Sequence, residues 1–177
     1  MIETQTLGTL SRSADARSRF EELYRSSRDD VYAYVMTLLR DRIAAEDVTA
    51  LAFERAYRRR ITFDRRRGVE RAWLFGIARN AALDELRRRK RVATLTTDPE
   101  ASEASVEDGA EVALRRTAVR TALAGLPARE REIVALKFHG GLSNAELARV
   151  LGVSETGAGT LLYRAMEKLR KACDETR

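Results

Sequence analysis

RAWLFGIARNAALDELRRRKR, residues 71 to 91, is the segment that most clearly indicates how this chain folds. Its apolar residues recur every three or four positions, which is the spacing of an amphipathic α-helix and not of a strand. The predicted helix contains the only tryptophan of the chain and ends in five consecutive basic residues. Its apolar face is predicted to consist of Leu74, Ile77, Ala78 and Ala81.

A neighbouring face of the same predicted helix mixes aromatic, amide and cationic side chains. It includes Trp73, Gly76, Asn80, Leu83 and Arg87. This combination suits unpaired nucleic-acid bases, because an aromatic ring stacks on any base for about 1–3 kcal/mol while arginines hold the backbone. An equally good interpretation of these residues alone makes Trp73 an anchor in the core and the arginines a solvated rim.

Helical spacing also extends over the preceding part of the chain. The apolar residues predict one or two helices between Phe20 and Leu39, and a further helix between Ala44 and Ala56. The arginine-rich segment 58 to 71, which contains Gly68, is predicted to be a loop. Since strand-type alternation is hard to find anywhere in the 177 residues, the predicted fold class is all-α.

Charge is distributed unevenly along the chain, whose net charge is +6 and whose pI is near 9.9. Between Arg58 and Arg91 there are thirteen basic residues and four acidic ones. Residues 92–114 contain six acidic residues, no basic one and many small residues, which is typical of a flexible linker. The basic surplus favours a polyanion partner such as nucleic acid, although a merely soluble basic protein fits the total charge equally well.

The linker predicts two small helical domains. The expected organisation is an N-terminal tail over residues 1–17, a helical domain over 18–91, the acidic linker over 92–114 and a second helical domain over 115–177.

Composition argues against several functional classes. No apolar run approaches the roughly 20 residues of a membrane span, and the N-terminus lacks a signal-peptide pattern, so we expect a cytoplasmic protein without membrane insertion. The single Cys173 excludes an internal disulfide, and with the single His139 leaves too few soft ligands for zinc. We therefore expect neither a metal nor a cofactor, and no residue spacing indicates a catalytic site.

The segment from residue 143 to 172 has the features of a helix-turn-helix. Ser143 and Glu146 form a capping box, the first helix runs to about Leu151, and Gly152 makes the turn. Ser154 then caps a second helix that runs to about residue 172. This pattern predicts a DNA-binding unit whose second helix enters the major groove, with an ordinary helical hairpin as the alternative.

Candidate DNA contacts lie on the exposed side of that second helix. Only the N-terminal ones are placed for base edges, whereas Arg164 and Lys168 are better placed for phosphates. Gly157 and Gly159 each cost this helix roughly 1 kcal/mol relative to alanine. The candidate contacts are Ser154, Glu155, Thr156, Thr160, Tyr163, Arg164 and Lys168.

Three segments together resemble the extracytoplasmic-function (ECF) sigma factors, group 4 of the sigma-70 family of bacterial RNA polymerase subunits. FEELYRSSRDDVYAYVMTLLRDRIAAEDVTALAFERAYRR, residues 20 to 59, resembles the start of their second region, and residues 71 to 91 resemble its promoter-melting and minus-ten segment. LPAREREIVALKFHGGLSNAELARVLGVSE, residues 126 to 155, resembles their fourth region. The resemblance covers about residues 18 to 91 and 115 to 172, and its most specific part is RAWLF-IARN followed by D-LRRR.

This resemblance implies a non-catalytic subunit that directs core RNA polymerase to promoters and captures the melted minus-ten strand. It implies that the fourth region reads duplex DNA at the minus-thirty-five element, and that the loop from Ile61 to Val69 shapes a pocket for an extruded base. It also implies an anti-sigma factor as a further partner. The implied contacts to the polymerase clamp are Ala45, Glu46, Asp47, Val48 and Phe53, and those to minus-ten DNA are Trp73, Arg79, Asn80, Asp84, Arg87 and Arg88.

The chain departs from the family pattern at two places. Ala50 and Leu51 stand where a glutamine and an acid are common, and TGAGTL at residues 156 to 161 lacks the cations usual at the start of the recognition helix. The main alternative is a stand-alone helix-turn-helix repressor or activator that binds duplex DNA. A recombinase with Tyr163 or Tyr57 as nucleophile is a third possibility, which would require clustered catalytic arginines and a larger scaffold.

Overall fold

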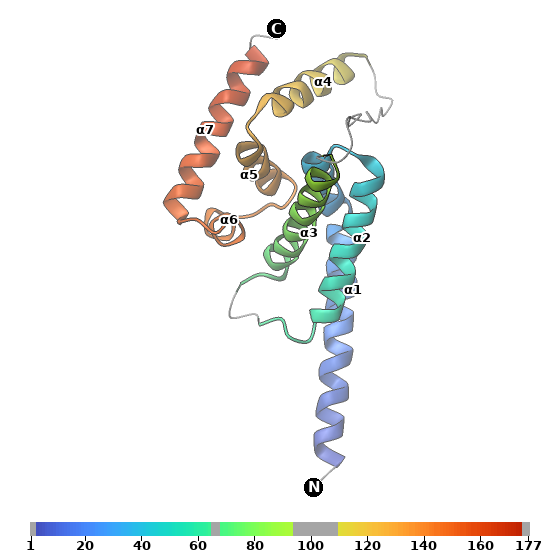
Figure 1. Ribbon diagram of the computed structural model, residues 1–177. Coiled ribbons are helices and arrows are strands. Elements are labelled where there is room, and N and C mark those ends of the chain that lie inside the picture. Colours follow the sequence, from blue (N-terminus) through green and yellow to red (C-terminus); the bar gives the residue numbers. More distant parts are fainter. Residues whose placement is uncertain (1–2, 65–67, 94–109, 175–177) are drawn as a thin grey trace.

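The computed structural model describes residues 3–64, 68–93 and 110–174, and these ranges contain seven α-helices and no strand. The predicted all-α fold class is confirmed. The first three helices lie side by side and form the N-terminal half, and the last four form the C-terminal half (Figure 1). The helices are α1 (Glu3–Leu39), α2 (Arg42–Arg59), α3 (Glu70–Ala93), α4 (Ala110–Gly125), α5 (Ala128–Phe138), α6 (Asn144–Leu151) and α7 (Glu155–Asp174).

Helix α1 is one continuous helix of 37 residues, where the sequence allowed one or two. It includes residues 3–17, for which the sequence predicts a tail, and the N-terminal end of α1 extends away from the other helices (Figure 1). The helix ends where Arg40 adopts a positive φ of 52°. Asp41 then caps α2, because its carboxylate accepts a hydrogen bond of 3.0 Å from the backbone N–H of Ala44. These two residues together reverse the chain.

The N-terminal half is held together by the apolar faces of its three helices. Small residues at many contact positions of α2 and α3 let the helix backbones approach closely. Phe75 packs edge-on against Tyr34, with ring centroids 5.5 Å apart. The fully buried side chains include Val31, Tyr34 and Val35 of α1, Ala45, Ala52 and Ala56 of α2, and Leu74, Phe75, Ala78 and Ala82 of α3.

The C-terminal half contains the predicted helix-turn-helix, with α6 and α7 as its two helices. Both bonds of the predicted capping box between Ser143 and Glu146 are present, and Gly152 ends α6 in the left-handed conformation at φ 67°. Ser154 caps α7 by accepting a 3.0 Å hydrogen bond from the N–H of Gly157. Pro127 is the N-cap of α5, directly before the first helical turn in which we had expected it. The local signals in the sequence therefore predict the positions of these helix ends correctly.

The predicted linker is partly helical. Helix α3 continues to Ala93 and α4 begins at Ala110, so both ends of the 92–114 segment belong to helices, and residues 94–109 lie outside the described residues. The two halves are in contact: α5 lies against α1, and α6 lies against α3. Their buried apolar residues form one contiguous cluster, so the core spans both halves.

Within the described ranges, no helix combines the length and apolar character that a bilayer span requires. The same ranges contain no group of three or more His, Cys, Asp or Glu side chains arranged to hold a metal ion.

Candidate nucleic-acid interface

Trp73 lies beside an open cavity of about 560 Å³ between the two halves. Its ring is partly buried against the core, and Phe63 lies against it with ring centroids 5.1 Å apart and an interplanar angle of 46°. Trp73 therefore packs on the core, as one of the two interpretations predicts, and its side chain also lines a cavity, while stacking on bases stays a prediction. The other lining residues include Arg59, Asp64, Val69, Asn80, Arg149 and Val150.

Asn80 and Arg79 follow one another on α3 but have different surroundings. Asn80 is exposed and lines the cavity, so its amide is available to a ligand there. The guanidinium of Arg79 instead donates from Nε to Glu132 Oε1 of α5 over 2.7 Å, and only 22% of its side chain is exposed. Arg79 remains a predicted DNA contact, but in this structure its guanidinium forms an ion pair with Glu132 of the C-terminal half.

Glu132 is the buried carboxylate that joins α5 to α1 and α3. Only 8% of its side chain is exposed, and besides Arg79 it accepts a 3.4 Å hydrogen bond from the hydroxyl of Tyr34. Burial, together with the charge of Glu132, raises the pKa of Tyr34 well above its usual value. The Tyr34 hydroxyl therefore stays protonated and remains a donor at neutral pH.

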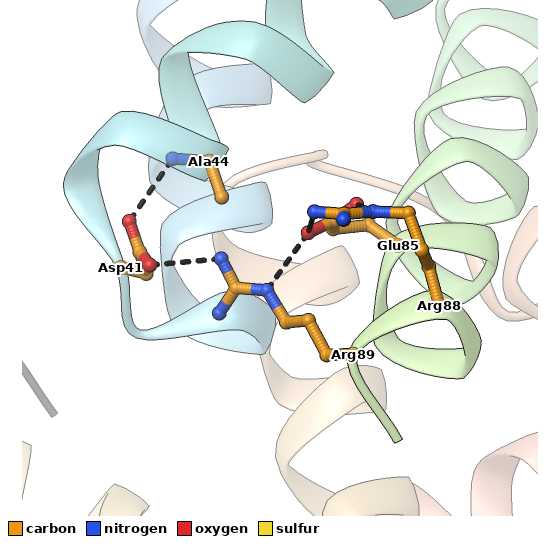
Figure 2. Close-up of polar contacts among 5 residues, drawn as sticks. All are labelled: Asp41, Ala44, Glu85, Arg88 and Arg89. Carbon is orange, nitrogen blue, oxygen red and sulfur yellow. Dashed lines mark hydrogen bonds and ion pairs between the residues drawn. The ribbon is translucent and has the colours of Figure 1, made fainter. Parts of the chain in front are cut away.

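The arginines at the end of α3 are arranged in ion pairs with carboxylates. Arg87 contacts Asp84 at 3.0 Å, and Arg88 makes two bonds of 2.7 and 2.8 Å to Glu85. Arg89 bridges Glu85 to Asp41, the cap of α2, with 2.8 Å to each carboxylate (Figure 2). The bonds from Arg88 and Arg89 lower the pKa of Glu85 from 4.5 to about 2.

These pairs affect the predicted minus-ten contacts differently. Arg87 and Asp84 are both more than half exposed, so their pair lies in solvent and contributes little to stability. A phosphate can therefore replace Asp84 on Arg87 at small cost, whereas Arg88 is held by Glu85, whose side chain is only 13% exposed. Arg89, by contrast, is only one-third exposed and ties α3 to the start of α2.

The predicted recognition helix α7 presents all of its candidate DNA contacts to solvent. Tyr163 is 67% exposed, and Lys168 is exposed although its ammonium contacts Glu130 of α5 at 2.7 Å. A Cβ added to Gly157 would lie 3.0 Å from Ser154 Oγ, so this glycine leaves room for the capping hydroxyl. The exposed residues are Ser154, Glu155, Thr156, Thr160, Tyr163, Arg164 and Lys168.

The predicted polymerase-binding surface of α2 divides into exposed and buried residues. Glu46 and Asp47 are exposed, whereas Ala45 is fully buried and Val48 and Phe53 are each 5% exposed. The three buried residues face α1 and α3, because only one side of this packed helix points outward. In this structure they pack inside the N-terminal half, and their contact with the polymerase stays a prediction. The neighbouring Ile43 is 74% exposed and lies near Glu46 and Asp47 on the outward side of α2.

Sequence reasoning missed part of the cavity. The sequence analysis includes Phe63 in the predicted pocket loop but assigns it no contact of its own. It is the one aromatic residue in the arginine-rich segment 58 to 71. Arg149 and Val150 come from α6, and only the packing of the two halves brings them to α3. No local pattern indicates such a contact.

Comparison with known proteins agrees with this arrangement. The family model for Sigma-70 region 2 matches residues 23–92, and that for Sigma-70 region 4 matches residues 116–169. The ECF RNA polymerase sigma factor SigL of Mycobacterium tuberculosis is 32% identical over 155 residues, which cover 86% of this chain and 88% of SigL. The chain belongs to the ECF RNA polymerase sigma factor family. The N-terminal half thus corresponds to sigma region 2 and the C-terminal half to region 4.

Further relatives support the assignment of this ECF sigma factor. BldN of Streptomyces coelicolor, also an ECF sigma factor, is 36% identical over 156 residues, but the match covers only 59% of BldN and 86% of this chain. The structure of CnrH in complex with the cytosolic domain of CnrY superposes with a TM-score of 0.64 at 25% identity, covering 93% of this chain and 96% of CnrH. RpoE of Bartonella quintana, solved in complex with the anti-sigma factor NepR, has the same fold, with a TM-score of 0.77 at 21% identity and coverage of 90% and 99%.

The family models can also be compared with the two alternative functions, a stand-alone helix-turn-helix regulator and a recombinase. Both matched family models describe sigma-70 regions and neither describes a catalytic domain. A stand-alone repressor would account for α6 and α7 but not for the region 2 match over residues 23–92.

Proposed function

We propose that this ECF sigma factor joins core RNA polymerase, directs it to a two-part promoter and captures the melted minus-ten strand in the cavity beside Trp73. The observation that carries the proposal is the cavity itself. It combines a pair of aromatic rings in tilted contact, Phe63 and Trp73, with the exposed amide of Asn80. An aromatic platform beside a hydrogen-bonding amide suits an unpaired base, which offers a π-face for stacking and a polar edge for recognition.

Two other surfaces would complete the function. The exposed side of α2 with Ile43, Glu46 and Asp47 would bind the polymerase clamp. The N-terminal residues of α7 would read the minus-thirty-five element as duplex, with Arg164 and Lys168 on its phosphates. Core polymerase and promoter DNA are the partners of this function, and we expect it to take place in the cytoplasm.

An anti-sigma factor is a further proposed partner. The structural relative CnrH was solved with the cytosolic domain of CnrY bound. Because the chain is similar to CnrH over 93% of its length, we expect an equivalent protein to bind this sigma factor.

The proposal is tested by transcription with purified core polymerase on a library of promoter fragments, with and without this chain. We expect promoter-specific transcripts, and we expect Trp73→Ala to reduce them about tenfold or more, since stacking on one base is worth about 1–3 kcal/mol. Asn80→Ala should also reduce them, because it removes the amide that would hydrogen-bond the base. Binding of both variants to core polymerase should be unchanged.

Trp73 also packs on the core, so its variant needs a control for folding. Trp73→Phe keeps an aromatic ring and should restore much of the activity, while thermal unfolding checks that each variant folds. Glu22→Ala, at an exposed position of α1, should leave transcription unchanged. Absence of core binding, together with tight binding of the free chain to intact duplex, would favour the stand-alone repressor instead.

A further inference from the structure

The contact between the two halves uses a charged group from the predicted strand-binding segment. Arg79 of α3 and Tyr34 of α1 both donate to Glu132 of α5, which lies at the centre of this contact. The side chains of Arg79 and Glu132 are only 22% and 8% exposed, so solvent screens their attraction weakly. A guanidinium predicted to hold nucleic acid is therefore occupied by a carboxylate of the C-terminal half.

Arg71 makes a second connection between the halves, at the C-terminal end of α5. Its Nε and Nη2 atoms donate to the carbonyl oxygens of Gly140 and His139 over 2.6 and 2.8 Å. The same guanidinium contacts Asp30 at 2.6 Å and Ser27 at 3.0 Å, both on α1. Carbonyls at a helix end lack partners within the helix and favour a cation, so Arg71 fixes the end of α5 to the N-terminal half.

Helix α6 covers part of the cavity beside Trp73. Arg149 and Val150 of α6 line that cavity together with Asn80 and the aromatic pair. Arg149 also lies against Gly68, where an added Cβ would come within 2.6 Å of the Arg149 guanidinium. At the far side of the contact, Arg40 donates to the carbonyl of Ala124 over 3.0 Å. The C-terminal half thus contacts the strand-binding groups and restricts the space in front of them.

We propose that this contact is an autoinhibitory clasp, in which the C-terminal half of the free chain occupies groups that the melted strand requires. This inference rests on the proposed function, because it concerns the same cavity and the same arginine. A strand that enters the cavity competes with Arg149 and Val150 of α6 for the space there, and a phosphate that binds Arg79 must displace Glu132. Strand binding and the clasp are therefore mutually exclusive, so whatever separates the halves increases affinity for the strand.

Glu132 and Glu130 provide a matched pair of variants to test the clasp. Both are buried glutamates of α5 paired with a cation at 2.7 Å, but Glu130 pairs with Lys168 of the same half and Glu132 with Arg79 of the other. Glu132→Ala leaves the Arg79 charge without its partner inside the contact, which strongly favours separation. Glu130→Ala removes a similar pair without touching the contact between the halves.

The separation is measured as a distance distribution between two spin labels on the full-length chain. The labels are attached to cysteines at the exposed positions Glu22 of α1 and Lys171 of α7, in a background with Cys173→Ser. We expect a single distance population for the parent and for Glu130→Ala. For Glu132→Ala we expect a second, longer population and at least a tenfold fall in the ratio of closed to open molecules.

A double variant with exchanged charges distinguishes loss of the ion pair from a general loss of folding. Arg79→Glu combined with Glu132→Arg restores an ion pair of opposite orientation and should return the distribution toward the closed form. An unchanged distribution in Glu132→Ala would overturn the clasp. Equal opening in Glu130→Ala would overturn it as well, since the cause would then be loss of structure within the C-terminal half.

Strand binding completes the test, with a fluorescein-labelled pool of random-sequence single-stranded DNA as the probe. Glu132→Ala should bind it about tenfold more tightly than the parent, and the additional Trp73→Ala change should remove the gain while the halves stay open. If the halves open without a gain in binding, yet the parent chain supports promoter-specific transcription, the inhibitory role is overturned. If no variant supports transcription with core polymerase, the proposed function itself has failed.

Discussion

Glu85 of α3 carries a charge that is fixed by its neighbours. Bonds from Arg88 and Arg89 lower its carboxyl pKa from 4.5 to about 2, and Arg89 connects it to the cap of α2 (Figure 2). A lowered pKa means that the folded chain prefers the ionised carboxylate, so this contribution to stability is complete above pH 4.5. It is lost as the pH falls from 4.5 toward about 2.

We therefore predict that Glu85→Gln lowers the melting temperature at neutral pH and flattens its dependence on pH. The difference between the parent and the variant should shrink as the pH falls below 4.5, where the parent also loses the ionised carboxylate. Thermal unfolding followed by circular dichroism at a series of pH values measures both effects. Parallel curves for the two proteins across this range would contradict the assigned pKa.

At the scale of the element, the helix-turn-helix shows what the sequence can predict. The ends of α6 and the start of α7 follow from local signals, namely the Ser143 and Glu146 capping box, Gly152 and the Ser154 cap. Each signal acts within four residues of the helix end, so no tertiary information was needed.

Other features of the elements required knowledge of the packing. Helical spacing identified the apolar side of α2 but did not show that Val48 and Phe53 pack inside the N-terminal half, because a helix pattern does not say which neighbours will cover it. The pairing of Arg79 with Glu132 joins residues 53 positions apart. Helix α1 also includes residues 3–17, for which the sequence analysis predicts no helix.

Two glycines of the helix-turn-helix should respond in opposite ways to alanine. Gly152 has φ 67°, which costs an alanine side chain about 1 kcal/mol, so Gly152→Ala should lower the free energy of unfolding by that amount. Gly159 lies within α7, and an added Cβ would meet only Asn144 Nδ2 at an ordinary 3.8 Å. Gly159→Ala should therefore raise the free energy of unfolding by about 1 kcal/mol. Urea unfolding measures both, and a change of the same sign in the two variants would contradict this account.

At the scale of the whole molecule, the contact between the halves is expected to depend on pH through His139. Its carbonyl accepts from Arg71, and burial lowers the pKa of its imidazole below 6.5, although the charge of Asp30 acts in the opposite direction. The docked arrangement therefore prefers the neutral ring. Above pH 6.5 the imidazole is mostly neutral in the docked and the separated form, so docking is unaffected. As the pH falls below 6.5, the ring binds a proton more readily in the separated form, and docking is weakened.

The same pair of spin labels tests this expectation. Lowering the pH from about 7.5 to about 5.5 should increase the open population, and His139→Asn should remove most of that dependence. A pH response that is unchanged in His139→Asn would assign it to other groups.

Trp73 lies where the two halves meet, and it is the only tryptophan in the chain. Its indole emission comes from a single environment, in which Phe63 contacts the ring and α6 contributes to the cavity lining. Movement of α6 admits water to that environment and shifts the emission to longer wavelength, whereas a base stacked on the ring quenches it. The unlabelled chain thus carries an optical reporter that distinguishes an empty open cavity from an occupied one.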